Sequence, residues 1–168
     1  MDPRLRRYAI RQIGFFGISA AVMFLVAGRL DWLGGWLMVA MLLGGQAGQW
    51  LIVGRKHPDL LAERAGMGAD VDRRDVPFAM GMAYGPLVAM LVAALEVRLD
   101  GPPEVVPAVV IAGVVVSTLG VAVTMASMLA NRFFGPVVRI QADRGHQVAD
   151  GGPYRWVRHP GYVGAILF

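Results

Sequence analysis

Long apolar blocks, separated by short polar segments, dominate the pattern along this chain. Four of them are long enough to matter, and they run roughly over residues 12–28, 32–54, 77–97 and 104–131. Because an α-helix needs about 20 apolar residues to cross a bilayer, the blocks predict four transmembrane helices. A fifth apolar run begins near Gly161 and reaches Phe168, which predicts the start of a fifth helix. We therefore expect an all-α, polytopic membrane protein.

The polar segments between the blocks predict two helical hairpins. Arg29-Leu30-Asp31 joins the first two blocks, and the segment Arg98–Pro103 joins the last two. Both segments are too short for anything except a tight turn between antiparallel helices, and the Gly-Pro-Pro at 101–103 stops a helix. The longer segment Arg55–Val76 lies between the pairs, where Pro58 begins a predicted short interfacial helix.

Small and polar residues inside the blocks predict contacts between helices. Gly44 with Gly48, and Gly81 with Gly85, have the spacing that lets two helix backbones approach closely. Polar side chains in a lipid-facing helix normally turn into the bundle. We therefore expect Gln46, Gln49 and Tyr84 to form hydrogen bonds between helices, with contact to a substrate as the alternative.

The pattern changes after residue 131. Residues 137–141 alternate apolar and polar side chains, which predicts an extended segment, and turns follow at Asp143–His146 and Asp150–Pro153. Irregular backbone at a membrane surface must be solvated or folded over a ligand. We expect one integrated domain, with a helical bundle over 1–130 and an irregular cofactor-binding segment, followed by the start of a truncated helix, over 131–168.

Composition supports a membrane protein over a soluble one. Hydrophobic residues make up 56% of the chain and charged residues 17%, whereas soluble domains carry about a quarter charged residues. There is no cysteine, which excludes disulfides, thiolate metal sites and cysteine nucleophiles. The sequence pI of about 10.1 is also compatible with nucleic-acid binding. We reject that interpretation because the basic residues lie at the ends of the apolar blocks.

The distribution of basic residues predicts the orientation. Fourteen of the sixteen lysine and arginine residues lie before the first block, between the second and third, or after the fourth. Only Arg29 and Arg98 lie on the other side. The positive-inside rule then places the N-terminus and the irregular segment in the cytoplasm. We expect an integral membrane protein, of the bacterial inner membrane by its composition, with the lipid bilayer as its environment.

A dense cluster of chemically useful side chains lies in the irregular segment. It combines imidazoles, aromatic faces, guanidinium groups and glycines that let a ligand approach the backbone. The cluster comprises His146, Gly151, Gly152, Tyr154, Arg155, Trp156, Arg158, His159, Gly161 and Tyr162. A ligand with an adenine, a carboxylate and a cationic sulfonium, such as S-adenosylmethionine, matches this set. The residue types fit NADPH or a phospholipid headgroup equally well, and they also fit simple interfacial anchors.

The order of these residues resembles a family signature. The segment GPYRWVRHPGYVG at Gly152–Gly164 is similar to that of isoprenylcysteine carboxyl methyltransferases and their phospholipid methyltransferase relatives. Val138–Gln141, Arg144–His146 and, more loosely, His57–Arg64 also resemble bacterial members. The resemblance implies a membrane enzyme that transfers a methyl group from S-adenosylmethionine to a carboxyl oxygen or a nitrogen. Its acceptor would be lipid-like or an isoprenoid, at the cytoplasmic face.

The resemblance also implies which residues contact the cofactor. By position they are Gln141, His146, Gln147, Val148, Ala149, Tyr154, His159, Pro160, Gly161 and Tyr162. Arg139 is an alternative to Gln141. A carboxylate acceptor is already ionised, whereas an amine must lose a proton, so we assign no catalytic base, and we assign no metal ligand. In the family a helix hairpin and a segment with a glutamate and an arginine follow the signature, so we expect this chain to be truncated.

Two other functions remain open from the sequence. A membrane reductase of the sterol-reductase type shares an Arg-His-Pro-x-Tyr-like ending and uses NADPH. An inactive, truncated membrane module is the other possibility. Neither the methyl acceptor nor the oligomeric state follows from these residues.

Overall fold

The computed structural model describes residues 3–64, 76–135, 145 and 147–168, and this part of the chain contains helices and no strand. The expected all-α class is confirmed there. The elements are α1 (Pro3–Ala27), α2 (Leu33–Gly48), the π-helix η1 (Gln49–Val53), α3 (Gly54–Lys56), α4 (Pro58–Glu63), α5 (Val76–Asp100), α6 (Pro107–Ala130), the 3-10 helix η3 (Gly152–Arg155) and α7 (Pro160–Leu167).

Three helices in the described residues are long and apolar enough to cross a membrane, which makes this an integral membrane protein. They are Leu5–Ala27, Leu33–Lys56 and Pro107–Ala130, and they coincide with three of the four predicted spans. The second of them runs without a break through α2, η1 and α3. The remaining predicted span, 77–97, lies within the 25-residue helix α5, and its crossing of the membrane stays a prediction. The eight residues of α7 rise only about 12 Å.

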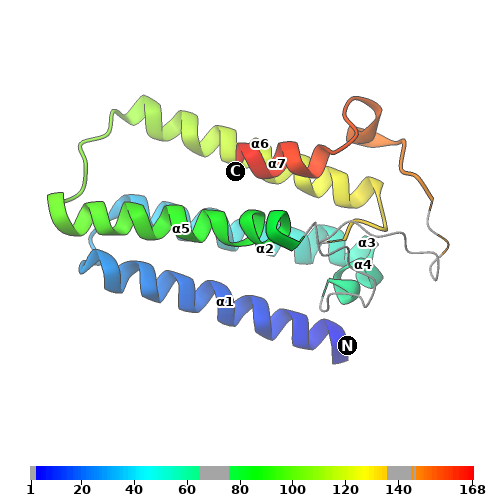
Figure 1. Ribbon diagram of the computed structural model, residues 1–168, viewed down its shortest axis with the longest axis horizontal. Coiled ribbons are helices and arrows are strands. Elements are labelled where there is room, and N and C mark those ends of the chain that lie inside the picture. Colours follow the sequence, from blue (N-terminus) through cyan, green and yellow to red (C-terminus); the bar gives the residue numbers. More distant parts are fainter. Residues whose placement is uncertain (1–2, 65–75, 136–144, 146) are drawn as a thin grey trace.

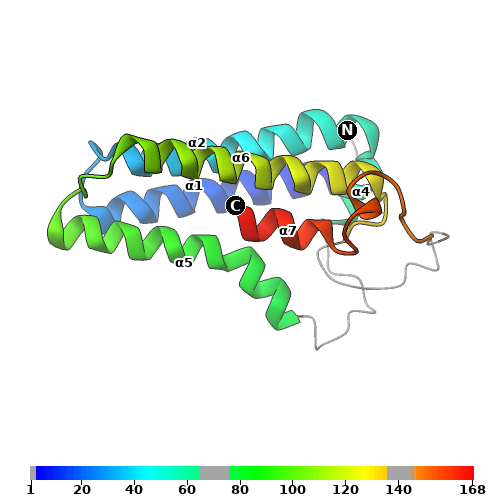
Figure 2. The same cartoon turned by 90° about the horizontal axis from the view of Figure 1, so that it is seen from above.

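The long helices run antiparallel in a bundle (Figure 1). The connections between α1 and α2 and between α5 and α6 lie at one end, which confirms both predicted hairpins. The N-terminus, α4 and η3 lie at the opposite end. α1 packs against α5, and α7 folds back along α6 (Figure 2). The described ends of the basic segments, which the sequence assigned to one side of the membrane, therefore lie together at one end of the bundle.

The two arginines at the hairpin end have local structural roles. Arg29 forms a two-point ion pair with Asp31, with 2.6 and 2.7 Å between donor and acceptor atoms, and this hydrogen bond lowers the pKa of Asp31 to about 2. The Arg98 guanidinium donates to the carbonyl oxygens of Leu25 and Val26. It thereby satisfies carbonyls that the last turn of α1 leaves without helical partners.

Two apolar clusters hold the bundle together, one toward each end. Toward the hairpins, Phe24, Trp32 and Met90 belong to a cluster shared by α1, α2 and α5. The other cluster joins the helices to α4, whose Leu60 and Leu61 are almost wholly buried. Many large apolar side chains elsewhere on the long helices are exposed. Such an extended apolar surface is expected where a protein faces lipid.

α5 bends, and its N-terminal part leaves the bundle (Figure 2). Pro86 lies inside this helix. A proline there removes one backbone hydrogen bond and its ring clashes with the preceding turn, which bends the helix. Pro86 also lines a cavity to which α7 contributes Gly164 and Ala165.

Glycines set the contact between α6 and α7. A Cβ atom on Gly120 would lie 2.7 Å from the Gly164 carbonyl oxygen, and a Cβ on Gly164 would lie 2.7 Å from that of Gly120. The backbones of the two helices therefore touch here. Of the glycine pairs expected to pack, Gly48 lies directly against Met125, whereas a Cβ on Gly44, Gly81 or Gly85 would meet nothing described within 4 Å. The packing prediction was thus wrong for the pair at 81 and 85.

Candidate functional site

The start of α7 carries the His-Pro pair of the signature. Pro160 occupies the first turn and is fully buried, a position suited to proline because it has no N–H to satisfy. His159 precedes it as the N-cap residue, yet its side chain makes no capping hydrogen bond. Its ring instead stacks on Tyr162, with the centroids 5.4 Å apart and the planes at 22°. Both side chains are exposed, so the pair presents flat faces to a ligand.

Tyr154 is anchored to the end of α6. The Asn131 side-chain nitrogen donates to the Tyr154 hydroxyl over 3.3 Å, and the Asn131 side-chain oxygen accepts from the backbone N–H of Phe133. Burial raises the pKa of Tyr154, and the bond from Asn131 opposes this shift. Gly152, at the start of η3, has a φ of +56°, which L-residues rarely adopt.

The first turn of α7 is also packed against the turn after α6. A Cβ atom on Gly161 would lie 2.7 Å from the Cε2 and Cζ atoms of Phe134. Phe134 in turn packs on the buried cluster around Leu60 and Leu61. The His159–Tyr162 pair is therefore held to the bundle through Gly161 and Phe134. Trp156, by contrast, is 84% exposed.

The structure brings together only part of the predicted cofactor set. Tyr154, on η3, packs on the end of α6, and so does the first turn of α7, which runs from Pro160 through Tyr162. Gln147 and Val148 are exposed and Ala149 is partly exposed, ahead of η3. Arg155 and Arg158 are exposed as well. The predicted residues Gln141 and His146, and the alternative Arg139, lie outside the described residues, as do the extended segment at 137–141 and most of the turn at 143–146.

An apolar cavity of about 250 Å³ lies in the bundle interior beside this segment. Its lining comes from α1, α2, η1, α5, α6 and α7, and is mostly apolar. A second apolar cavity of about 310 Å³, toward the hairpins, shares Met90 and Phe168 with it. Gln46 and Gln49 line the first cavity, and neither side-chain amide has a hydrogen-bond partner among the described residues. The expected hydrogen bonds between helices are therefore not formed by these two amides.

The first His-Pro pair of the chain has a structural role. His57 precedes α4 with nearly the same backbone angles as His159 before α7. Its Nε2 atom lies 3.3 Å from the carbonyl oxygen of Leu129, which can only accept, so this nitrogen carries the proton. Arg132 also pairs with Asp59 over 3.3 Å. Together the two contacts tie α4 to the end of α6.

Three residues that position the site were missed by sequence reasoning. Asn131 and Phe134 directly follow the last predicted span, and Arg64 lies in the polar segment Arg55–Val76, where the sequence predicts a short interfacial helix. A signal was present for Asn131 and Phe134, because a polar residue and aromatics directly follow a predicted span. No sequence signal indicates that the Nε and Nη1 atoms of Arg64 are buried.

Residues 107–168, from α6 to the end of α7, match the model of the isoprenylcysteine carboxyl methyltransferase (ICMT) family. The resemblance carried by Gly152–Gly164 is thereby confirmed for this part of the chain. No curated protein and no solved structure matches the chain. The match supports a membrane methyltransferase and does not favour an NADPH-dependent reductase.

Proposed function

We propose that this protein is an S-adenosylmethionine-dependent methyltransferase that acts on a lipid-like or isoprenoid acceptor at the cytoplasmic face of the membrane. One observation carries the proposal. The part of the chain that matches the methyltransferase family is also the part in which His159, Tyr162 and Tyr154 gather at the end of α6. This segment stands beside an apolar cavity within membrane-spanning helices.

The described residues suit the cofactor by their chemistry. The stacked His159 and Tyr162 offer a flat face for adenine, or a π-face for the sulfonium. The imidazole of His159 is free of capping and can donate or accept a hydrogen bond near neutral pH. S-adenosylmethionine, when bound, supplies an electrophilic methyl group. The residues proposed to hold it remain Gln141, His146, Gln147, Val148, Ala149, Tyr154, His159, Pro160, Gly161 and Tyr162.

The cavity suits the acceptor. Its apolar walls favour a hydrocarbon chain, which would enter from the bilayer. The amides of Gln46 and Gln49 are polar groups in this lining without a described partner, so they are available to orient a polar head. Methyl transfer requires that the nucleophile and the methyl group be aligned and that water be excluded. A carboxylate acceptor needs no catalytic base, and we propose none.

The orientation follows from charge. Lysine and arginine are concentrated in the segments at the end of the bundle where the N-terminus, α4 and η3 lie. The positive-inside rule assigns that end to the cytoplasm. A cofactor made in the cytosol then reaches the candidate site directly.

Titration of the purified, detergent-solubilised protein with S-adenosylhomocysteine tests the proposal. We expect saturable binding by the wild type, and loss of binding in His159→Ala. Trp156→Ala is the matched control, since it removes a largely exposed aromatic side chain of the same segment, and the affinity of this variant should stay at the wild-type value. Wild-type affinity in His159→Ala, or saturable binding of NADPH in place of S-adenosylhomocysteine, would contradict the assignment.

A further inference from the structure

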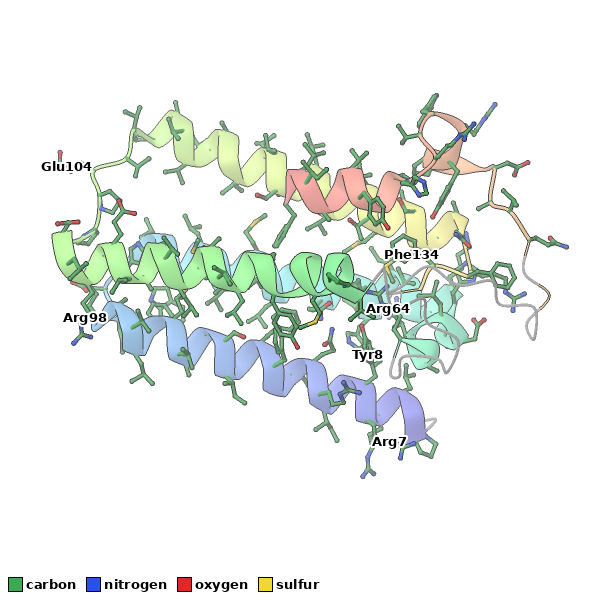
Figure 3. All side chains as sticks on the ribbon, in the orientation of Figure 1. Arg7, Tyr8, Arg64, Arg98, Glu104 and Phe134 are labelled. Atoms are coloured by element: carbon green, nitrogen blue, oxygen red, sulfur yellow. The ribbon has the colours of Figure 1, made fainter. Side chains whose placement is uncertain are left out.

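Arg64 ends α4 with its guanidinium turned into the protein. Its Nε and Nη1 atoms are buried, and neither has a hydrogen-bond partner in the part of the chain that the structure describes. The Cζ atom stands over the ring of Phe134, 5.7 Å from its centroid. Figure 3 shows the two side chains together at the α4 end of the bundle, opposite the end with Arg98 and Glu104.

Contacts on several sides hold the helix that carries Arg64. Its helix is held by the buried Leu60 and Leu61 and by the contact of His57 with Leu129. Asp59, on the same helix, forms its ion pair with Arg132. These contacts hold α4, and with it Arg64, against the buried cluster and the end of α6.

Two buried N–H donors of a charged group that lack a described partner are costly. Arginine cannot lose its proton in a protein, so burial cannot be relieved by neutralisation. An unpaired buried charge destabilises the folded state, and contact with the π-face of Phe134 offsets only part of that cost. Buried polar groups without partners are rare, and a binding site for a charged ligand is a physical reason for one.

Arg64 lies close to the proposed cofactor segment. The guanidinium of Arg64 packs over the ring of Phe134, and a Cβ atom on Gly161 would lie 2.7 Å from the same ring. Gly161 is the second residue of α7, next to the His159–Tyr162 pair. One aromatic ring thus separates the unpartnered cation from the backbone of the signature. The signature arginines Arg155 and Arg158 are exposed.

We propose that Arg64 binds an oxyanion of a ligand held at this end of the bundle. A planar guanidinium pairs with a carboxylate or phosphate through two parallel hydrogen bonds. Two sources carry such a group: the amino-acid carboxylate of the cofactor and the anionic head of the acceptor. The assignment to these two ligands rests on the proposed function, whereas the anion site itself rests on the geometry of Arg64.

Binding measurements on Arg64→Gln separate the two sources. The probes are S-adenosylhomocysteine, 5′-methylthioadenosine, which lacks the amino-acid group, and palmitate as a carboxylate on an apolar chain. If the cofactor carboxylate occupies the site, affinity for S-adenosylhomocysteine falls about 10- to 100-fold and affinity for 5′-methylthioadenosine is unchanged. If the acceptor occupies it, the affinity for palmitate falls instead. Arg64→Lys should recover part of the loss, because it keeps the charge without the two-point geometry.

Arg132→Gln is the matched control, since it removes an exposed guanidinium from the same region. It should leave all three affinities within about twofold. Wild-type affinity of Arg64→Gln for every probe that the wild type binds would overturn the inference. Failure of the wild type to bind S-adenosylhomocysteine would count against the proposed methyltransferase alone, and the palmitate measurement would still test the anion site.

Thermal unfolding without ligand distinguishes a binding role from a structural one. Replacing an unpaired buried charge with an apolar side chain of similar length relieves the folded state, so Arg64→Met should unfold at the wild-type temperature or above it. A lower unfolding temperature would mean that Arg64 stabilises the fold and would contradict the inference.

Discussion

Gly164→Ala is the smallest change that separates α7 from α6. The new Cβ atom would lie 2.7 Å from the Gly120 carbonyl oxygen and 2.9 Å from the Thr124 nitrogen, and it would also strike the Thr124 hydroxyl. A carbon usually stays about 3.3–3.6 Å from a carbonyl oxygen, so the helices must separate by roughly 0.6–0.9 Å. The obstacle is helix backbone, which cannot turn aside as a flexible side chain does.

The magnitude follows from the nature of the clash. Overpacking a tight contact costs about 1–3 kcal/mol of folding free energy. For a chain of this length, that lowers the unfolding temperature by about 2–12 °C. Because α7 carries His159 and Tyr162, we expect the affinity for S-adenosylhomocysteine to fall as well.

Circular dichroism of the protein in detergent, recorded during heating, measures this change. Gly85→Ala is the matched control, since an added Cβ there meets nothing described within 4 Å and alanine favours a helix over glycine. The control should unfold at or above the wild-type temperature. If Gly164→Ala matched the control in both unfolding temperature and affinity, α7 would not dock on α6 through this glycine.

Three further changes test other parts of the structure. Burial raises the pKa of Tyr154 above its ordinary value of 10.0, so the contribution of the Tyr154 hydroxyl to folding stability is present below pH 10 and is lost as pH rises through the folded pKa. The unfolding temperature of Tyr154→Phe should therefore fall less steeply than that of the wild type above pH 10, and an unchanged slope would refute this. Arg98→Ala removes the donor to the last carbonyls of α1 and should lower the unfolding free energy by about 0.5–1.5 kcal/mol; no change in a thermal melt would contradict the capping role. His57→Ala removes the contact with Leu129 and should also lower the unfolding free energy by about 0.5–1.5 kcal/mol, while the affinity for S-adenosylhomocysteine stays unchanged. An unchanged melt together with a lower affinity would assign His57 to the binding site.

The sequence was informative where a property depends on a run of residues. Block length predicted the helices, and the short polar segments at Arg29 and Arg98 predicted the hairpins. The order of residues in Gly152–Gly164 predicted the family, because a signature is itself a sequence pattern. None of these predictions depends on which faces of two helices pack against each other.

The sequence was uninformative where a property depends on how two helices pack against each other. Gly81 and Gly85 have the spacing of a packing motif, yet Gly120 and Gly164, far apart in the chain, form the backbone contact. A glycine in an apolar block looks the same in both situations. Gln46 and Gln49 likewise line a cavity where hydrogen bonds between helices were expected.

Ultraviolet cross-linking of methyl-labelled S-adenosylmethionine to the detergent-solubilised protein, followed by peptide mapping, tests the central claim most directly. We expect a saturable adduct in the segment 141–162 that excess S-adenosylhomocysteine removes and excess NADPH does not. Absence of a saturable adduct, or one that NADPH removes and S-adenosylhomocysteine does not, would contradict it.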